Sequence, residues 1–267
     1  MTADQHQDTD NDPVVLTETR GSTLLVTLNR PRRSNAIDEA MQRSLHDLWA
    51  TVRLDRSLRC IIVTGAGKAF CAGADVAMLA SDERTGGDDA TAELAFLPGR
   101  QVEIPVIAAV NGVCAGGGLH FVADADITIA AESARFLDPH VSVGQVSALE
   151  PLGLRLRMRP DRLARMVLLG RAEVLDAVTA EKAGLVSQVT ADGALLDTAF
   201  DLAERIAANS PEAVRLSRRV LRRFEQRLLE TDEDLGWELI QRHWSHPDAT
   251  EGPTAFSEKR DPRWADR

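Results

Sequence analysis

The stretch that most constrains how this chain can fold is residues 105–126, PVIAAVNGVCAGGGLHFVADAD. Its apolar run at 106–110 predicts a strand buried on both faces. Three glycines at 116–118 follow, and then a helical pattern whose first turn carries His120. Glycines let backbone approach a ligand closely, and the first N–H groups of a helix have no partner within it. The segment therefore predicts a site for an oxygen on which negative charge develops.

A glycine triplet alone also fits a phosphate site or close packing of two backbones. A dinucleotide-binding fingerprint is not expected, because no G-x-G-x-x-G motif stands at the right place in a strand–helix–strand unit. The triplet needs a second feature to specify its chemistry.

Further apolar runs at 60–64 and 127–130 predict two more buried strands. With helical segments between the strands, this order is typical of an α/β fold with a mainly parallel sheet. Alternation over 14–28 around Gly21-Ser22 predicts a β-hairpin. Asp38 is a plausible N-cap for a helix ending near residue 54, with one apolar face made of Ala40, Leu45, Leu48 and Val52.

The remaining chain predicts short helices at 163–169, 173–177 and 181–184, a strand at 185–189, and helices at 197–208, 211–229 and 232–244. Asp75 is expected to cap a short helix at 76–80, and the polar residues 81–90 are expected to form a loop that borders a pocket. The arginine-rich face at 215–228 is expected to be solvated or to face another subunit rather than to bind a ligand. The domain plan is a disordered tail at 1–13, a core at 14–208 and a C-terminal helical segment at 209–267.

Composition limits the classes of partner. The net charge is −10, from 31 Lys and Arg against 41 Asp and Glu, which argues against nucleic acid. Three cysteines without metal-ligand spacing predict neither a disulfide framework nor a metal site. The acidic N-terminus lacks the plan of a signal or transit peptide, and no run approaches 18 apolar residues. A cytoplasmic protein with no membrane association is expected.

Several further motifs accompany the glycine-rich stretch: NRPRRSNAI at 29–37, AFCAGAD at 69–75, RFLDPH at 135–140, AGLVSQV at 183–189 and EGPTAFSEKR at 251–260. In order and spacing the chain beyond residue 13 resembles the crotonase (enoyl-CoA hydratase/isomerase) superfamily. The resemblance implies a ClpP-like spiral of ββα units, with C-terminal helices that build a homotrimer or a hexamer made of two trimers. It implies an acyl-CoA thioester as substrate, and no cofactor beyond the CoA of that substrate.

The same resemblance implies an oxyanion hole formed by the backbone N–H groups of Ala72 and Gly117, which would hold the thioester oxygen. The CoA site is expected to be lined by the backbone of Ala72, Gly73, Ala74, Asp75 and Gly117, by Arg32, and by Phe256 and Lys259.

Hydratases of this family use two glutamates, and this chain has His120 and His140 at those two positions. Simple two-glutamate hydration is therefore not expected. A helix N-terminus disfavours the imidazolium form of His120, which suits a base, and His140 follows Asp138, whose carboxylate can orient or charge it. Glu150 is a third candidate, although it also fits a surface position, as both histidines fit ordinary pocket or core positions.

Cys114 is expected to pack rather than react, and Asp126 to anchor a strand. The expected function is an enzyme acting on a CoA thioester through an enolate held in the oxyanion hole. Hydrolytic C–C cleavage of a β-keto or cyclic acyl-CoA and isomerisation are the two expected reactions. The alternative is a non-catalytic acyl-CoA-binding protein.

Overall fold

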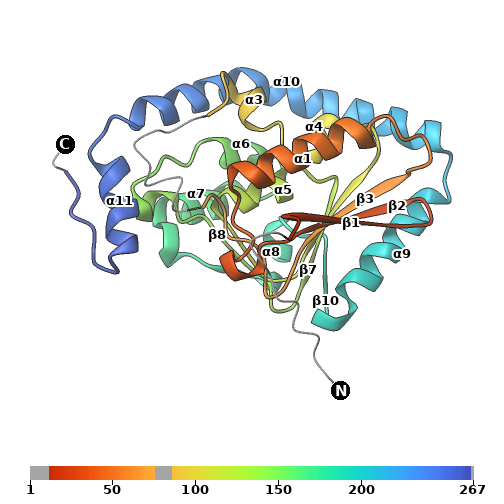
Figure 1. Cartoon of the computed structure of the whole chain (residues 1–267), viewed down its shortest axis with the longest axis horizontal. Coiled ribbons are helices and arrows are strands. Elements are labelled where there is room, and N and C mark those ends of the chain that lie inside the picture. Colours follow the sequence, from red (N-terminus) through yellow and green to blue (C-terminus); the bar gives the residue numbers. More distant parts are fainter. Residues whose placement is uncertain (1–11, 76–85, 266–267) are drawn as a thin grey trace.

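Two sheets form the centre of the protein, whose computed structural model describes residues 12–75 and 86–265 (Figure 1). The larger sheet has the order β1-β2-β3-β5-β7-β10, in which only the β1–β2 pair is antiparallel. Its strands are β1 Val15–Arg20, β2 Thr23–Leu28, β3 Cys60–Gly65, β5 Val106–Val110, β7 Ile127–Ala131 and β10 Gln188–Thr190. The predicted hairpin turns at Gly21, where φ is +58°. The three strands predicted to be buried are β3, β5 and β7.

The smaller sheet has the order β4-β6-β8-β9. Its strands are β4 Ala69–Cys71, β6 Val113–Ala115, β8 Arg135–Leu137 and β9 Leu175–Asp176. Each of β3, β5 and β7 is followed along the chain by one of these short strands, which gives the expected spiral of ββα turns. Two sequence predictions were wrong here: part of the predicted 70–75 loop is β4, and the predicted helix at 173–177 gives way to β9.

Helix α1 (Glu39–Val52) begins at the predicted cap, where the Asp38 carboxylate accepts a hydrogen bond of 2.8 Å from the Met41 N–H. Its buried face is Met41, Leu45, Trp49 and Val52. Leu45 and Val52 were predicted correctly, whereas Ala40 and Leu48 are only half-buried and Met41 and Trp49 take their places. The reason is Trp49, whose indole N–H donates to the Phe96 carbonyl at 2.7 Å and fixes the rotation of the helix.

Helix α9 (Leu195–Ala207) covers the outer face of the larger sheet, and its buried residues meet the β2, β3, β5 and β7 side chains of that face. The opposite face belongs to the main core, which extends to the smaller sheet and the remaining helices. Those helices are α3 Ala90–Glu93, α4 Pro98–Gln101, α5 Leu119–Asp124, α6 Leu149–Arg155, α7 Pro160–Leu169 and α8 Ala177–Ala183.

The C-terminal segment is one long helix, α10 (Pro211–His243), and a shorter one, α11 (Asp248–Ser257). The expected break near residue 230 is absent because Glu233, Gly236 and Trp237 are buried and keep the helix on the core. In Figure 1, α10 runs along one edge of the molecule past α3 and α4. No helix within the described ranges is both long and apolar enough to span a membrane.

The expected solvated face of α10 is wrong for two arginines. Arg218 is 7% exposed, and its guanidinium donates to Asp126 Oδ2 at 2.7 Å and to the carbonyls of Val102 and Gly99. Asp126 also accepts from the Val106 N–H at 2.8 Å, which confirms its anchoring role. Arg222 joins the same network through Asp126 Oδ1 at 3.1 Å. The tail at 1–11, the helix at 76–80 and residues 81–85 of the predicted loop lie outside the described residues.

Candidate active site

The two glycine-rich stretches meet at the carboxyl ends of the paired strands β4 and β6. Gly73 has φ of +94°, and a Cβ atom there would lie 2.9 Å from both the Ala115 carbonyl oxygen and the Gly117 nitrogen. Only glycine permits both that conformation and that approach. Gly117 belongs to a short 3-10 turn, Gly116–Gly118, so its N–H is among the first of a helical segment and needs an external acceptor.

The second donor of the expected oxyanion hole is not Ala72. The Ala72 N–H donates to the Ser34 carbonyl at 3.0 Å, and it is therefore already used. The Ala74 N–H is in a different position: Ile37 bonds to the flanking Gly73 and Asp75, and no described residue accepts from the Ala74 N–H. The Ala74 nitrogen lies 3.4 Å from the position of a Cβ built on Gly117. The structure thus brings Ala74, rather than Ala72, next to Gly117.

Asp75 has a structural task in this loop. Its Oδ2 lies 3.0 Å from Arg30 Nη2, and the same guanidinium reaches Asp38 Oδ2 at 3.1 Å and the Ala36 carbonyl at 2.5 Å. Because the side chains of Arg30 and Asp75 are largely buried, this pairing holds the 30–38 segment against the loop after β4.

His120, Glu150 and His140 form one cluster beside the glycine turn. Glu150 Oε1 lies 3.1 Å from His120 Nε2 and 3.6 Å from His140 Nε2. A Cβ on Gly116 would contact the His140 ring at 3.4 Å, so this ring lies against the turn itself. The side chain of Glu150 is 6% exposed, so the surface alternative for this residue is wrong. All three sequence candidates are therefore brought together.

Three separate elements supply the cluster. His120 is the second residue of α5, directly after the glycine turn, and its ring packs edge-on against Phe96 with centroids 6.2 Å apart. His140 opens a 3-10 turn, His140–Val143, after β8. Glu150 lies in the first turn of α6.

Asp138 fixes the other side of His140. Its Oδ1 is 2.6 Å from His140 Nδ1 and accepts from the His140 backbone N–H at 3.1 Å, while Oδ2 accepts from the Ser147 hydroxyl at 2.5 Å. Asp138 is fully buried. Because a carboxylate only accepts, Nδ1 of His140 carries the hydrogen and Nε2 faces Glu150.

The electrostatics separate the roles of these groups. Burial alone acts to lower the pKa of His140, but the Glu150 and Asp138 carboxylates outweigh it and raise this pKa to about 9. Burial acts to raise the pKa of Glu150, and the two histidines outweigh it, so this pKa lies well below its ordinary value. At neutral pH the cluster therefore holds an imidazolium at His140 and a carboxylate at Glu150.

Other candidates lie elsewhere. Arg32 is exposed on a 3-10 turn at Pro31–Arg33, Phe256 is 49% exposed near the end of α11, and Lys259 is exposed just beyond that helix. Their contacts with CoA remain predictions. Cys114 is fully buried on β6, and burial raises the pKa of its thiol well above the ordinary value, in agreement with a packing role.

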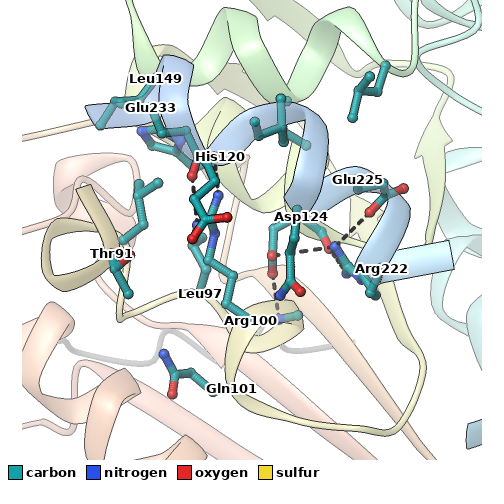
Figure 2. A pocket seen from close by; sticks show the side chains of 18 of the residues that line it. Thr91, Leu97, Arg100, Gln101, His120, Asp124, Leu149, Arg222, Glu225 and Glu233 are labelled. Atoms are coloured by element: carbon teal, nitrogen blue, oxygen red, sulfur yellow. Dashed lines mark hydrogen bonds and ion pairs between the residues drawn. The ribbon is translucent and has the colours of Figure 1, made fainter. Parts of the chain in front are cut away.

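A cavity of about 550 Å³ lies between α4, α5, α6 and α10, and His120 and Leu149 are among its lining residues (Figure 2). Asp89 also lines it, so the described end of the predicted 81–90 loop borders a pocket as expected. Its wall includes Arg100 and Glu233, which face each other across α4 and α10. Nothing in the local sequence pairs these two residues, because they meet only once α10 folds back over α4.

The two sheets, the paired glycine loops and a buried acid–base cluster beside them define a crotonase-type protein. Its resemblance to known proteins extends over nearly the whole chain. The profile of one family, described as enoyl-CoA hydratase/isomerase, matches residues 18–267, and the chain belongs to this family.

Individual relatives agree with this assignment. Enoyl-CoA hydratase EchA19 of Mycobacterium tuberculosis is 37% identical, over 96% of this chain and 97% of its own length. Carnitinyl-CoA dehydratase of Proteus mirabilis is 34% identical, over 93% of this chain and 97% of its own. The crystal structure of carnitinyl-CoA hydratase from Mycobacterium avium superposes with a TM-score of 0.86 at 30% identity, covering 96% of this chain and all of that one. The family and these names support an enzyme that acts on an acyl-CoA.

Proposed function

We propose that this protein hydrolyses a C–C bond in a β-keto or cyclic acyl-CoA, with His120 as general base and His140 as general acid. The observation that carries the proposal is the position of Glu150 between the Nε2 atoms of the two histidines, at 3.1 Å and 3.6 Å. A carboxylate there orients both rings, as the aspartate of a Ser-His-Asp triad orients its histidine.

The base is assigned by its hydrogen bond. When His120 donates its Nε2–H to Glu150, Nδ1 is left as the acceptor for a proton from water. His120 lines the large cavity, so a substrate carbonyl bound there lies within its reach. Glu150 itself is a weak base because its pKa is depressed, and its role is positioning.

The water oxygen bonds to the β-carbonyl carbon while His120 takes one water proton. The bond between the α- and β-carbons breaks, and its electron pair becomes the thioester enolate. His140 then gives the Nε2 proton to the α-carbon, yielding a carboxylic acid and a shortened or ring-opened acyl-CoA. The surplus proton on His120 Nδ1 then passes to solvent, and His140 takes up a proton from solvent, so both histidines return to their starting forms.

The enolate oxygen is assigned to the N–H groups of Ala74 and Gly117. These donors belong to backbone that Gly73 and the 3-10 turn hold in place before the reaction. By analogy, removing one preorganised donor of this kind costs about 3–4 kcal/mol of transition-state stabilisation.

The relatives named as hydratases and dehydratases favour a second candidate, addition or elimination of water at an enoyl-CoA. In hydration, His120 would again act as the base and His140 as the acid. The water oxygen would bond to the β-carbon and the proton to the α-carbon. Isomerisation through the enolate and binding without chemistry are the remaining alternatives.

We also propose a trimer or a pair of trimers built through the C-terminal segment. Helix α10 carries large apolar side chains that are mostly exposed in one chain, including Val220 at 70%, Leu221 at 67% and Phe224 at 65%. Light scattering after gel filtration tests this assembly, and a monomer contradicts it.

The deciding experiment incubates the purified full-length protein with enoyl-, β-keto- and cyclic acyl-CoA thioesters and follows each by mass spectrometry. Cleavage of a β-keto or cyclic acyl-CoA, with one oxygen of labelled water in the released carboxylate, supports the main proposal. Conversion of enoyl-CoA alone supports the second candidate. Tight binding with every thioester unchanged supports the non-catalytic alternative.

A further inference from the structure

Another cavity, of about 510 Å³, lies between the 53–59 loop after α1 and the start of α10. Its other walls are the 101–105 segment before β5 and the end of α9. No residue of the acid–base cluster lines it, and among the described residues it shares only Gln101 with the cavity at His120. A volume of this size is within the range of small-ligand sites. The cavity is therefore examined as a site separate from the active site.

The apolar side chains that line this cavity are all aliphatic. Val52, Leu58 and Val102 are buried, at 5%, 6% and 5% exposed, whereas Leu54 is 73% exposed. The others are Ile104, Pro105, Ile206, Ala207, Pro211 and Val214. No described aromatic side chain lines the cavity, so a planar ring would have nothing to stack on. These walls favour a ligand with an aliphatic body.

Two acidic residues of the lining are neutralised within the protein. Glu212 accepts from Arg215 Nη2 at 2.7 Å, and Glu103 accepts from Arg215 Nη1 at 2.8 Å and from Arg219. These two carboxylates and two guanidinium groups balance one another in charge. They therefore leave the charge of the cavity to the 53–59 loop.

This loop places three arginines in the lining. No described residue makes a hydrogen bond or an ion pair with the side chain of Arg53, Arg56 or Arg59. Arg53 and Arg56 are exposed, and Arg59 is half-buried. Asp55, the remaining acidic residue of the lining, accepts from the Ser57 N–H at 2.8 Å and from the Ser57 hydroxyl at 2.6 Å. The loop thus presents three guanidinium groups against one carboxylate, in a chain whose net charge is −10.

Three helix ends at the cavity agree with a local preference for an anion. Helix α10 begins there at Pro211, and the positive end of its dipole adds to the arginines. Helices α1 and α9 end there, but their terminal carbonyls have partners within the chain. The Trp49 carbonyl accepts from the Arg53 N–H at 3.0 Å, and the Arg205 carbonyl accepts from the Asn209 amide at 2.9 Å.

We propose that this cavity is a second ligand site, which binds an aliphatic carboxylic acid with its chain on the apolar walls and its carboxylate on Arg53, Arg56 and Arg59. Guanidinium groups bind carboxylates through strong, charge-assisted and often bidentate hydrogen bonds. An uncharged chain gains only the contact with the walls, and a positively charged one is repelled by the arginines. The inference does not depend on the proposed reaction, because the site and the acid–base cluster share no residue.

Calorimetry on the full-length protein tests the ligand class. The protein is first saturated with butyryl-CoA, so that a thioester site is filled, and is then titrated with octanoate, 1-octanol, octylamine or acetate. Octanoate is expected to bind about tenfold or more tightly than 1-octanol and octylamine, because only octanoate gives charged hydrogen bonds to the arginines. Acetate, which lacks the chain, is expected to bind at least tenfold more weakly than octanoate. Absence of octanoate binding, or equal binding of octanoate and 1-octanol, overturns the inference.

A triple substitution tests the residues. Arg53→Gln, Arg56→Gln and Arg59→Gln together are expected to weaken octanoate binding about tenfold or more and to leave the melting temperature nearly unchanged, since no described side chain loses a partner. The matched control makes the same change of net charge at three exposed arginines that do not line the cavity: Arg155→Gln, Arg171→Gln and Arg242→Gln. The control is expected to keep the wild-type affinity for octanoate. Equal affinity in the two triple variants overturns the assignment to the 53–59 loop.

Discussion

Glu150 Oε1 lies 3.1 Å from His120 Nε2, although the two residues belong to different helices. His120 follows the glycine turn on α5, and Glu150 lies in the first turn of α6. Both side chains are nearly inaccessible to solvent, at 6% and 11% exposed. A buried carboxylate in contact with the ring beside an oxyanion turn sets the tautomer of that ring. The same Glu150 oxygen lies 3.6 Å from His140 Nε2, so the charge of Glu150 acts on both histidines.

Replacing Glu150 with Gln keeps the shape and removes the charge. The pKa of His140 is expected to fall from about 9, because the Glu150 carboxylate is one of the two charges that raise it. The alkaline limb of the kcat/KM profile, which reports the acid of the free enzyme, should move to lower pH, and turnover should fall about tenfold or more. Glu173→Gln, in an ion pair outside the cluster, is the control. An alkaline limb that stays in place contradicts the coupling.

The folded protein should lose stability as pH rises toward 9. The pKa of His140 is raised on folding from about 6.5 to about 9, so the native state holds this proton more tightly than the unfolded chain. The contribution is complete below pH 6.5 and is lost between pH 6.5 and 9. A shift of this size corresponds to about 3 kcal/mol in the free energy of unfolding.

Urea unfolding at pH 6, 7, 8 and 9 measures this dependence. In His140→Gln the fall across this range should be largely absent, because the titrating group is gone. If the free energy of unfolding falls equally in His140→Gln, the pH dependence belongs to other groups.

The fold was largely predictable because its signals are local. The buried strands β3, β5 and β7 are continuous apolar runs, the hairpin turns at a glycine, and Asp38 caps α1. The short strands β4, β6, β8 and β9 were missed because two or three residues carry no period of their own. The continuity of α10 was missed because tertiary packing of Trp237 and its neighbours, rather than propensity, carries the helix past residue 230.

Gly73→Ala should disable the oxyanion site. The φ of +94° is strained for alanine, and the new methyl group would lie 2.9 Å from the Ala115 oxygen and the Gly117 nitrogen. We expect a loss of about 1–3 kcal/mol in unfolding free energy and a much larger relative loss of turnover. Gly193→Ala, where a Cβ meets nothing within 4 Å and φ is not positive, is the control. Full activity in folded Gly73→Ala contradicts the placement of the site.

Arg218→Ala should destabilise the fold by about 3–5 kcal/mol, because it leaves the Asp126 carboxylate and two carbonyls without their buried partner. Arg219→Ala removes a neighbouring arginine that is 58% exposed and should change stability by less than about 1 kcal/mol. Thermal or urea unfolding compares the two. Equal effects contradict the anchoring role of Arg218.

The site was predictable only in part. His120 and His140 were found by their position in motifs, and Asp138 by its nearness in sequence to His140. The contact of Glu150 with both rings depends on how α6 packs against α5, which sequence spacing does not report. The oxyanion donor was assigned two residues early because only the hydrogen bond from the Ala72 N–H to Ser34 shows that this group is already used.

The most direct test of the central claim is turnover of the acyl-CoA panel by wild type, His120→Ala and His140→Ala, with His46→Ala as control. His46 is 60% exposed on α1, so its loss removes a histidine without touching the cluster. The account predicts that wild type and His46→Ala consume a thioester, and that each cluster variant remains folded and is slower by about 100-fold or more. Turnover that survives unchanged in both cluster variants, or wild-type protein that binds the thioesters and consumes none, would contradict it.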